Sequence, residues 1–257
     1  MVKTFDLKEK NILITGGYGY LGKAVVESLC YHGANVYVLG RSKEKFSNSF
    51  KTIIESEFEY CDVSDQNSVE KAIQNIVQNT GSIDVLINNA FYLPTVSSNE
   101  LTDTEFTHGL DGVLTSTYRC IKSAIPIFEK QRYGKIINVS SMYGIVAPEF
   151  EIYNNFPNYT NPPHYGAAKA GVLQLTRYFA SLLAKINVQV NSITPGPFPS
   201  EQVQKSSDFI DELKDKTLLK KIGSPEDLAG AFTFLSSEAA NYITGQNIII
   251  DGGWTIK

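Results

Sequence analysis

The chain has 257 residues, a formal net charge of −4 and three widely spaced cysteines, Cys30, Cys61 and Cys120. This length suits one α/β domain with a sizeable core. The near balance of charge argues against a nucleic-acid surface, and the scattered cysteines and histidines lack the spacing of metal ligands. With no signal-peptide pattern and no apolar run of ~18 residues, we expect a cytoplasmic protein without a metal, membrane or nucleic-acid partner.

Short apolar runs alternate with helical patterns along the chain. The strand-like runs are NILITGG, NVYVLG, FEYCDV, IDVLINNA, GKIINVSS, VQVNSI and NIIIDGG. They are nearly continuous in Val and Ile, which is typical of parallel strands covered on both faces. Because helical stretches separate them, one of these at 104–130, the sequence predicts a Rossmann-type doubly wound parallel sheet of about seven strands, with helices on both faces. Without a linker or composition break, residues 1–257 are expected to form a single domain.

A glycine-rich loop, TGGYGYLG at residues 15–22, follows the first strand and opens a helix. Small residues there let the backbone approach a pyrophosphate, which faces the helix N-terminus. A plain tight turn is the alternative interpretation. The second strand ends in Gly40 and Arg41, where a carboxylate would bind a ribose 2′-hydroxyl and an arginine suits a 2′-phosphate. The sequence therefore predicts that NADP(H) is preferred to NAD(H), unless Arg41 is only a solvated surface residue.

One tyrosine in the segment 139–169 has the surroundings of an acid/base group. The segment contains Tyr143, Tyr153, Tyr159 and Tyr165. A lysine four residues further along a helix lies on the same face, and a nearby cation lowers the phenol pKa from its ordinary value of about 10. Only Tyr165, with Lys169, has this spacing, and Pro162 and Pro163 before it suit a helix start. A phenol of this kind can deliver a proton to a developing alkoxide.

Seven motifs then occur in one order: TGGYGYLG, CDVSD at 61–65, NNA at 88–90, NVSSMYG at 138–144, YGAAKAG at 165–171, NSITPGPFPS at 191–200 and GQNIIIDGG at 245–253. With them the chain resembles the shorter branch of the short-chain dehydrogenases/reductases over essentially its full length. The resemblance implies a nicotinamide-dependent enzyme that interconverts a carbonyl and an alcohol. It also implies a homo-oligomer, either a tetramer or a dimer.

The resemblance assigns roles to individual residues. Tyr165 would be the acid/base, Lys169 would activate it and bind the nicotinamide ribose, and Ser141 would hold the substrate oxygen. Ser140 is expected to bond only to backbone. The expected cofactor-binding set begins with Gly16, Tyr18, Tyr20, Leu21 and Gly22 of the glycine loop and with Arg41 at the 2′-phosphate. By the resemblance, Asp62 and Val63 would flank the adenine, Asn89 and Ala90 would line the adenosine ribose, and Lys169 would bind the nicotinamide ribose. Pro195 and Gly196 would pass the nicotinamide, and Ser200 would contact its carboxamide.

Three positions depart from the family pattern. Tyr20 stands where the shorter branch usually has glycine, and Phe91 replaces the glycine that usually follows NNA. Val113 aligns with a helix residue that is often asparagine in the family's proton relay, a role that depends on a helix irregularity and a bound water. Whether the relay is altered here is left open by the sequence.

An insertion at about 147–163 lengthens the segment between Ser141 and Tyr165 beyond that of many family members. It is rich in aromatic, Asn and Pro residues, and it joins the strand and the helix that carry the predicted site, where loops set specificity. Flat rings with amides suit a sugar or sugar-derived substrate, and the insertion with PGPFPS resembles members from bacterial surface-sugar pathways. A subunit contact or a packed lid without substrate contact fits the same composition.

The sequence therefore predicts an NADP(H)-dependent oxidoreductase for a small carbonyl or alcohol substrate. A reductase of a lipophilic or acyl ketone is the alternative among enzymes. A catalytically weak NADP(H)-sensing protein is the alternative from another class, since Phe91 and Val113 depart from the family pattern while Ser141, Tyr165 and Lys169 keep it.

Overall fold

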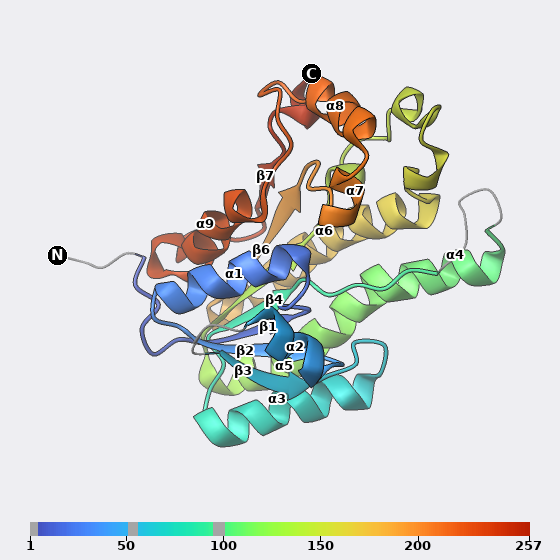
Figure 1. The fold of residues 1–257 in the computed structure, drawn as a ribbon. Helices are drawn as coiled ribbons and strands as arrows, with labels where there is room; N and C mark the ends of the chain where they lie inside the picture. Colours follow the sequence, from blue (N-terminus) through green and yellow to red (C-terminus); the bar gives the residue numbers. More distant parts are fainter. Residues whose placement is uncertain (1–4, 51–55, 95–100) are drawn as a thin grey trace.

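A single seven-stranded parallel sheet organises the computed structural model, which describes residues 5–50, 56–94 and 101–257 (Figure 1). The strands are β1 (Asn11–Thr15), β2 (Asn35–Gly40), β3 (Ser56–Tyr60), β4 (Val85–Asn88), β5 (Gly134–Val139), β6 (Val188–Pro195) and β7 (Asn247–Ile250). Their order is β3-β2-β1-β4-β5-β6-β7, and every neighbouring pair is parallel. The prediction of a doubly wound Rossmann-type sheet is confirmed.

Helices cover both faces of the sheet (Figure 1). They are α1 (Tyr20–Tyr31), α2 (Lys43–Ser49), α3 (Gln66–Thr80), α4 (Asp103–Leu110), α5 (Ser116–Gln131), α6 (Pro163–Leu183), α7 (Glu201–Gln204), α8 (Ser207–Lys216) and α9 (Pro225–Ser236). The apolar faces of α3, α5 and α6 pack on one side of the sheet, and those of α1 and α9 on the other. The central strands β1, β4, β5 and β6 are buried on both sides and read as nearly continuous apolar runs, whereas the edge strands β3 and β7 are only partly buried. None of the helices in the described ranges is long and apolar enough to cross a membrane.

Local sequence signals explain several element boundaries. Helix α6 begins at Pro163 with Pro162 as its N-cap residue, as the proline pair predicted. Strand β3 ends at Tyr60, so CDV of the predicted run FEYCDV lies beyond it in the following loop. The helix expected at 104–130 is continuous but contains a π-helical turn at Asp111–Thr115 between α4 and α5. A π turn adds one residue to the helical repeat and often marks a functional position.

The insertion at 147–163 folds into two short 3-10 helices, Phe150–Tyr153 and Pro157–Tyr159, that pack against α8. Three of its rings surround Phe209 of α8, with ring centroids 6.0 Å away for Tyr153, 5.3 Å for Phe156 and 4.4 Å for Tyr159. In Figure 1 the insertion and α8 lie together near the C-terminus. The aromatic residues of the insertion therefore form a small core of their own.

This packing predicts the effect of Phe209→Ala. Phe209 is only 4% exposed, so the change should lower the free energy of unfolding by about 3–5 kcal/mol through lost burial and a cavity. Urea unfolding of the two proteins measures the difference. Phe150→Ala, at a residue of the same insertion that is 62% exposed, is the matched control and should change stability by less than about 0.5 kcal/mol. Equal losses for the two variants would contradict the proposed core.

Candidate functional site

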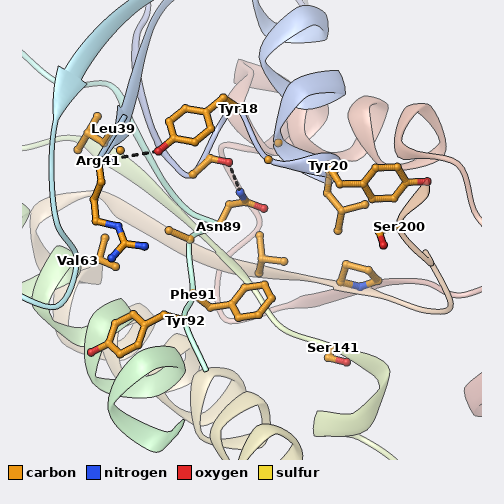
Figure 2. Close-up of a pocket in the computed structure, with 18 of the residues that line it drawn as sticks. Tyr18, Tyr20, Leu39, Arg41, Val63, Asn89, Phe91, Tyr92, Ser141 and Ser200 are labelled. Carbon is orange, nitrogen blue, oxygen red and sulfur yellow. Dashed lines mark hydrogen bonds between the residues drawn. The ribbon is translucent and has the colours of Figure 1, made fainter. Parts of the chain in front are cut away.

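A cleft of about 680 Å³ opens at the carboxyl ends of the strands (Figure 2). Its walls are the loops that follow β1 to β6, and it includes the point between β1 and β4 where the strand order reverses. Ligands bind at such switch points in open parallel sheets. All of the predicted site residues line this one cleft: Gly16, Tyr18, Tyr20, Leu21, Gly22, Arg41, Asp62, Val63, Asn89, Ala90, Ser141, Tyr165, Lys169, Pro195, Gly196 and Ser200.

Hydrogen bonds between β1 and the end of β4 fix the glycine loop. The Thr15 hydroxyl accepts the backbone N–H groups of Asn89 and Ala90, each at 3.0 Å. The Asn89 amide donates to the backbone carbonyls of Thr15 and Gly16, both at 3.1 Å. A side chain at Gly22 would come within 2.6 Å of the Gly16 carbonyl oxygen, so only glycine lets α1 start this close to the loop. The loop is thus rigid where a pyrophosphate would approach.

Tyr18 places its ring over the end of β2. The Tyr18 hydroxyl accepts the backbone N–H groups of Arg41 at 3.1 Å and Ser42 at 3.3 Å (Figure 2). A side chain at Gly40 would collide with this ring, because its Cβ would lie 2.4 Å from a ring carbon of Tyr18. The Tyr18 ring can therefore lie here only because residue 40 is glycine. The ring occupies the space in which a carboxylate at residue 40 would bind a ribose hydroxyl.

Tyr20 fits at a glycine position because its ring turns toward α7. The Gln204 side chain donates to the Tyr20 hydroxyl at 2.9 Å, and the ring lies beside Ser200 in Figure 2. Gly19, which precedes it, serves as the N-cap of α1. The departure at Tyr20 thus joins the glycine loop to the segment after β6 and leaves the centre of the cleft open.

The end of the cleft near β2 and β3 is positively charged. Arg41 is exposed and forms no ion pair with a described residue, and Lys45 lines the same wall. Burial raises the pKa of Asp62, but the N–H and O–H of Ser64, with Arg41, hold it below its ordinary value. The Asp62 carboxylate is therefore held by the Ser64 backbone N–H at 2.9 Å and its hydroxyl at 2.7 Å rather than by Arg41.

The two serines at the end of β5 have different partners. The Ser140 hydroxyl donates to the Lys169 carbonyl at 2.9 Å and is buried, which agrees with the purely structural role expected for it. The Ser141 hydroxyl oxygen accepts the Tyr143 N–H at 3.2 Å and lies within hydrogen-bonding range of the Tyr165 phenol. Since a hydroxyl can accept and donate at once, Ser141 can still donate to an oxygen in the cleft.

Lys169 and Tyr165 lie one helical turn apart on α6 and face the cleft. The Lys169 ammonium donates to the Val139 carbonyl at 2.8 Å, and burial lowers its pKa to about 7. Burial raises the pKa of Tyr165, and the hydrogen bond with Ser141 opposes that rise. This differs from the expectation that Lys169 lowers the phenol pKa. The physical reason is that burial disfavours phenolate and ammonium alike, so Lys169 is only partly charged at neutral pH.

Two aromatic residues after β4 were not among the predicted cofactor-binding residues. The Phe91 ring lies 5.3 Å from the Lys169 Nζ and 6.0 Å from the Tyr165 ring. The Tyr92 hydroxyl donates to Asp111, which also pairs with Arg119 at 2.6 Å, and this bond and burial raise the Tyr92 pKa to about 12. No spacing rule in the sequence could have identified Phe91 and Tyr92, because their partners lie in distant parts of the chain.

Lys45 and Phe198 also line the cleft and were not predicted. The sequence gives a signal only for Lys45, which is a basic residue close to Arg41.

Comparisons with known proteins agree with this geometry. Residues 20–255 match the family model described as enoyl-(acyl carrier protein) reductase. The chain is 32% identical over 262 residues to 2-dehydro-3-deoxy-D-gluconate 5-dehydrogenase of Formosa agariphila, covering 98% of this chain and 95% of the relative. It is 34% identical over 253 residues to 3-oxoacyl-(acyl-carrier-protein) reductase FabG of Staphylococcus aureus, covering 95% and 97%.

A solved structure shows the same likeness. The short chain dehydrogenase from Leptospira borgpetersenii with bound NAD+ is 31% identical, with a TM-score of 0.88 over 100% of this chain and 97% of that chain. A parallel sheet with this cleft and these relatives defines a nicotinamide-dependent oxidoreductase. The chain belongs to the short-chain dehydrogenase/reductase family, which supports the predicted enzyme over a cofactor-sensing protein.

The pKa of Lys169 predicts how stability depends on pH. Its folded-state value of about 7 lies below the ordinary 10.5, so between these values the unfolded chain binds more protons and the free energy of unfolding rises with pH. Lys169→Met removes this group. The stability of the variant relative to the parent should therefore be greatest below pH 7 and should decrease as the pH approaches about 10.

Urea unfolding of both proteins without cofactor, between about pH 6 and about pH 10, measures this difference. Lys185→Met is the control, because Lys185 is exposed and follows the same helix. Its difference from the parent should not vary with pH. A pH-independent difference for Lys169→Met as well would contradict the lowered pKa.

Proposed function

We propose that the protein is an NADP(H)-dependent oxidoreductase that interconverts a carbonyl and an alcohol, built as one domain around its single sheet. The observation that carries the proposal is the meeting of Ser141, Tyr165 and Lys169 at one end of a cleft whose other end is formed by the glycine loop and Arg41. Each of these features is common alone. Together they provide a proton donor, an oxygen anchor and a dinucleotide groove in one space.

The residues present fit a nicotinamide dinucleotide. The glycine loop offers a rigid backbone surface, and the cleft continues from Arg41 past Asn89 to Lys169. The Lys169 ammonium has three N–H donors, and one of them donates to the Val139 carbonyl. The other two can donate to ribose hydroxyls. When bound, the nicotinamide supplies or accepts the hydride of the reaction.

Tyr165 would move the proton. In the reduction direction its phenol donates to the substrate oxygen as negative charge develops there, while the Ser141 hydroxyl donates a second hydrogen bond to the same oxygen. Lys169 lies 5.7 Å from the Tyr165 ring centroid, so the charged fraction of its ammonium would stabilise the phenolate that remains, against the burial that disfavours it. In the oxidation direction the same groups act in reverse.

The residues at the end of β2 favour NADP(H). The relative from Leptospira borgpetersenii binds NAD+, so the choice in this chain depends on its own residues. Gly40 provides no carboxylate for a ribose 2′-hydroxyl, the Tyr18 ring covers that position, and Arg41 has no ion-pair partner among the described residues. A 2′-phosphate is the group that Arg41 binds best.

For the substrate, a sugar or sugar-derived carbonyl compound is the proposal that the cleft supports. The walls near Ser141 and Tyr165 include Phe91, Phe198 and Ser200, so flat rings and hydroxyls meet there. Lys169 is the one charged side chain among the described residues at this end. The Formosa agariphila relative is named for a sugar acid. The insertion adds no support, since its rings pack on Phe209 and none of its residues lines the cleft.

An acyl ketone is the second candidate, because the Staphylococcus aureus relative is a 3-oxoacyl reductase. A panel of sugars, sugar acids, polyols and acyl ketones separates the two substrate classes, with turnover read at the nicotinamide absorbance. Turnover of acyl ketones alone would exclude the sugar.

We also propose that the chain forms a homo-oligomer. Helices α5 and α6 expose Tyr118, Tyr178 and Leu182, which are 42%, 59% and 41% exposed. Strand β7 lies at one edge of the sheet (Figure 1). Its residue Ile249 is 41% exposed. Unpaired strand edges and apolar surface are commonly covered by another chain.

The cofactor proposal predicts the effect of Arg41→Leu. Removing a charged hydrogen-bonding partner of the 2′-phosphate should raise KM for NADPH by about 10- to 100-fold and leave KM for NADH nearly unchanged. Steady-state rates with both cofactors in parallel measure the two constants. Lys43→Leu is the control for general charge loss, since Lys43 is exposed and does not line the cleft. Parent rates with NADH equal to or above those with NADPH would overturn the preference.

The catalytic proposal predicts the effect of Tyr165→Phe. Loss of the proton donor should lower kcat by about 100- to 10,000-fold, while NADPH binding, followed by its fluorescence, stays close to that of the parent. Tyr178→Phe, on the same helix and 59% exposed, is the matched control and should keep the parent rate. A Tyr165→Phe variant that turns over its substrate at the parent rate would exclude Tyr165 as the acid/base.

A further inference from the structure

The π-helical turn Asp111–Thr115 is held by hydrogen bonds to its carbonyl groups. The Gly112 carbonyl accepts the Tyr92 N–H at 3.2 Å, and the Val113 carbonyl accepts the Thr117 hydroxyl at 2.9 Å. The Ser116 hydroxyl lies 2.8 Å from the Gly112 carbonyl and 3.3 Å from the Val113 carbonyl, and its single proton goes to the nearer one. These bonds tie the turn to the segment after β4.

The Val113 side chain, at the centre of this turn, is apolar. Val113 is 1% exposed and packs with Ala168 and Val172 of α6, and Tyr165 lies against the same cluster. In the family pattern this position often holds an asparagine of the proton relay. Here the space between the turn and α6 is filled by hydrocarbon, which offers Lys169 no polar partner from that side.

Lys169 instead has a ring beside it. The Lys169 ammonium is hydrogen-bonded to the Val139 carbonyl, and its Nζ lies 5.3 Å from the Phe91 centroid and 5.7 Å from the Tyr165 centroid. A cation within about 6 Å of a ring centroid is attracted by the negative face of the ring. Phe91 stands where the family usually has glycine, so this contact comes from a side chain that the family pattern lacks.

The backbone on both sides of Phe91 is held in place. The N–H of Ala90 donates to the Thr15 hydroxyl at 3.0 Å, and the N–H of Tyr92 donates to the Gly112 carbonyl at 3.2 Å. Phe91 is 50% exposed, and in Figure 2 its ring extends into the cleft between Asn89 and Ser141. The π turn, which binds the Tyr92 N–H, therefore helps to fix the backbone that carries the ring beside Lys169.

We propose that Phe91 is a positioning residue for Lys169, whose ammonium it holds and keeps charged by a cation–π contact, while Val113 offers no polar side chain at the position that is often asparagine. The two departures from the family pattern, Phe91 and Val113, thus both change the surroundings of the Tyr165 and Lys169 pair. This proposal rests on the proposed function only for the role of Lys169 in turnover, because the contact itself exists in the protein without substrate.

The groups around Lys169 give the sign of the expected effect. The titratable side chains on the surrounding elements are Tyr165 on α6, Tyr143 after β5 and Tyr92 after β4, and burial raises the pKa of each. All three are neutral near pH 7, and no carboxylate acts on Lys169. The Phe91 ring stabilises the charged form of Lys169, so its removal should lower the Lys169 pKa.

The test is an NMR titration of the full chain labelled with 13C at the lysine Cε positions, with Lys169→Met used to assign the Lys169 signal. Phe91→Leu should lower the Lys169 pKa by about 0.5 to 1 pH unit. Phe91→Tyr keeps a ring and should restore the parent value. Phe150→Leu, at an exposed phenylalanine outside the cleft, is the matched control. Should Phe91→Leu fold poorly, as judged by circular dichroism, Phe91→Met replaces it.

An unchanged Lys169 pKa in Phe91→Leu and Phe91→Met would overturn the proposal, as would an equal shift in Phe91→Tyr. A second measurement follows the pH dependence of kcat with the carbonyl substrate that the panel identifies. In Phe91→Leu, the apparent pKa that Lys169 contributes to this profile should decrease by the same amount as in the NMR titration. Because the NMR titration needs neither cofactor nor substrate, it tests the contact between Phe91 and Lys169 even if the protein reduces no carbonyl compound. A normal rate for Tyr165→Phe would count against the proposed function alone.

Discussion

Two reciprocal hydrogen bonds between the end of β5 and helix α6 hold together the end of the cleft where Ser141 and Tyr165 lie. The Lys169 side chain donates to the Val139 carbonyl, and the Lys169 carbonyl accepts the Ser140 hydroxyl. The chains approach so closely that a side chain at Gly144 would lie 2.7 Å from the Lys169 carbonyl carbon. This crossing places Ser141 and Tyr165 side by side although 24 positions separate them in the sequence. Any insertion between them is tolerated provided that it leaves this crossing unchanged.

The cofactor groove accommodates large rings in segments where small residues are usual, and each ring has a different compensation. Tyr18 rests on Gly40, where any side chain would collide with it. Tyr20 turns outward and bonds to Gln204. Phe91 stays in the cleft beside Lys169. A ring of this size needs an empty neighbouring position or an open direction, and each of these three rings has one.

The sequence predicted the parts of this molecule that depend on local patterns. The seven strands, the start of α6 at Pro163 and the grouping of the site residues all follow from periodicity, prolines and ordered motifs. The partners of buried rings did not follow, because a ring on a surface and a ring in a core have the same composition. Phe209, which organises the insertion, lies about 50 residues beyond it. The pKa of Tyr165 was also misjudged, since helical spacing reports the nearby lysine but not the burial of both groups.

The position of the insertion changes how it can influence the reaction. It does not line the cleft; it packs on Phe209 of α8 and pairs Glu149 with Lys216 at 2.5 Å. Helix α8 follows α7, whose N-cap Ser200 belongs to the cleft wall, and Gln204 of α7 is tied to Tyr20 of the glycine loop. The insertion thus contacts the segment after β6, and the hydroxyl of its Tyr153 also hydrogen-bonds that of Tyr143, two residues after Ser141. Three of the aromatic rings that suggested a sugar-binding surface pack on Phe209. An effect of the insertion on selectivity would therefore arise from the positions of these two neighbouring segments rather than from direct contact with the substrate.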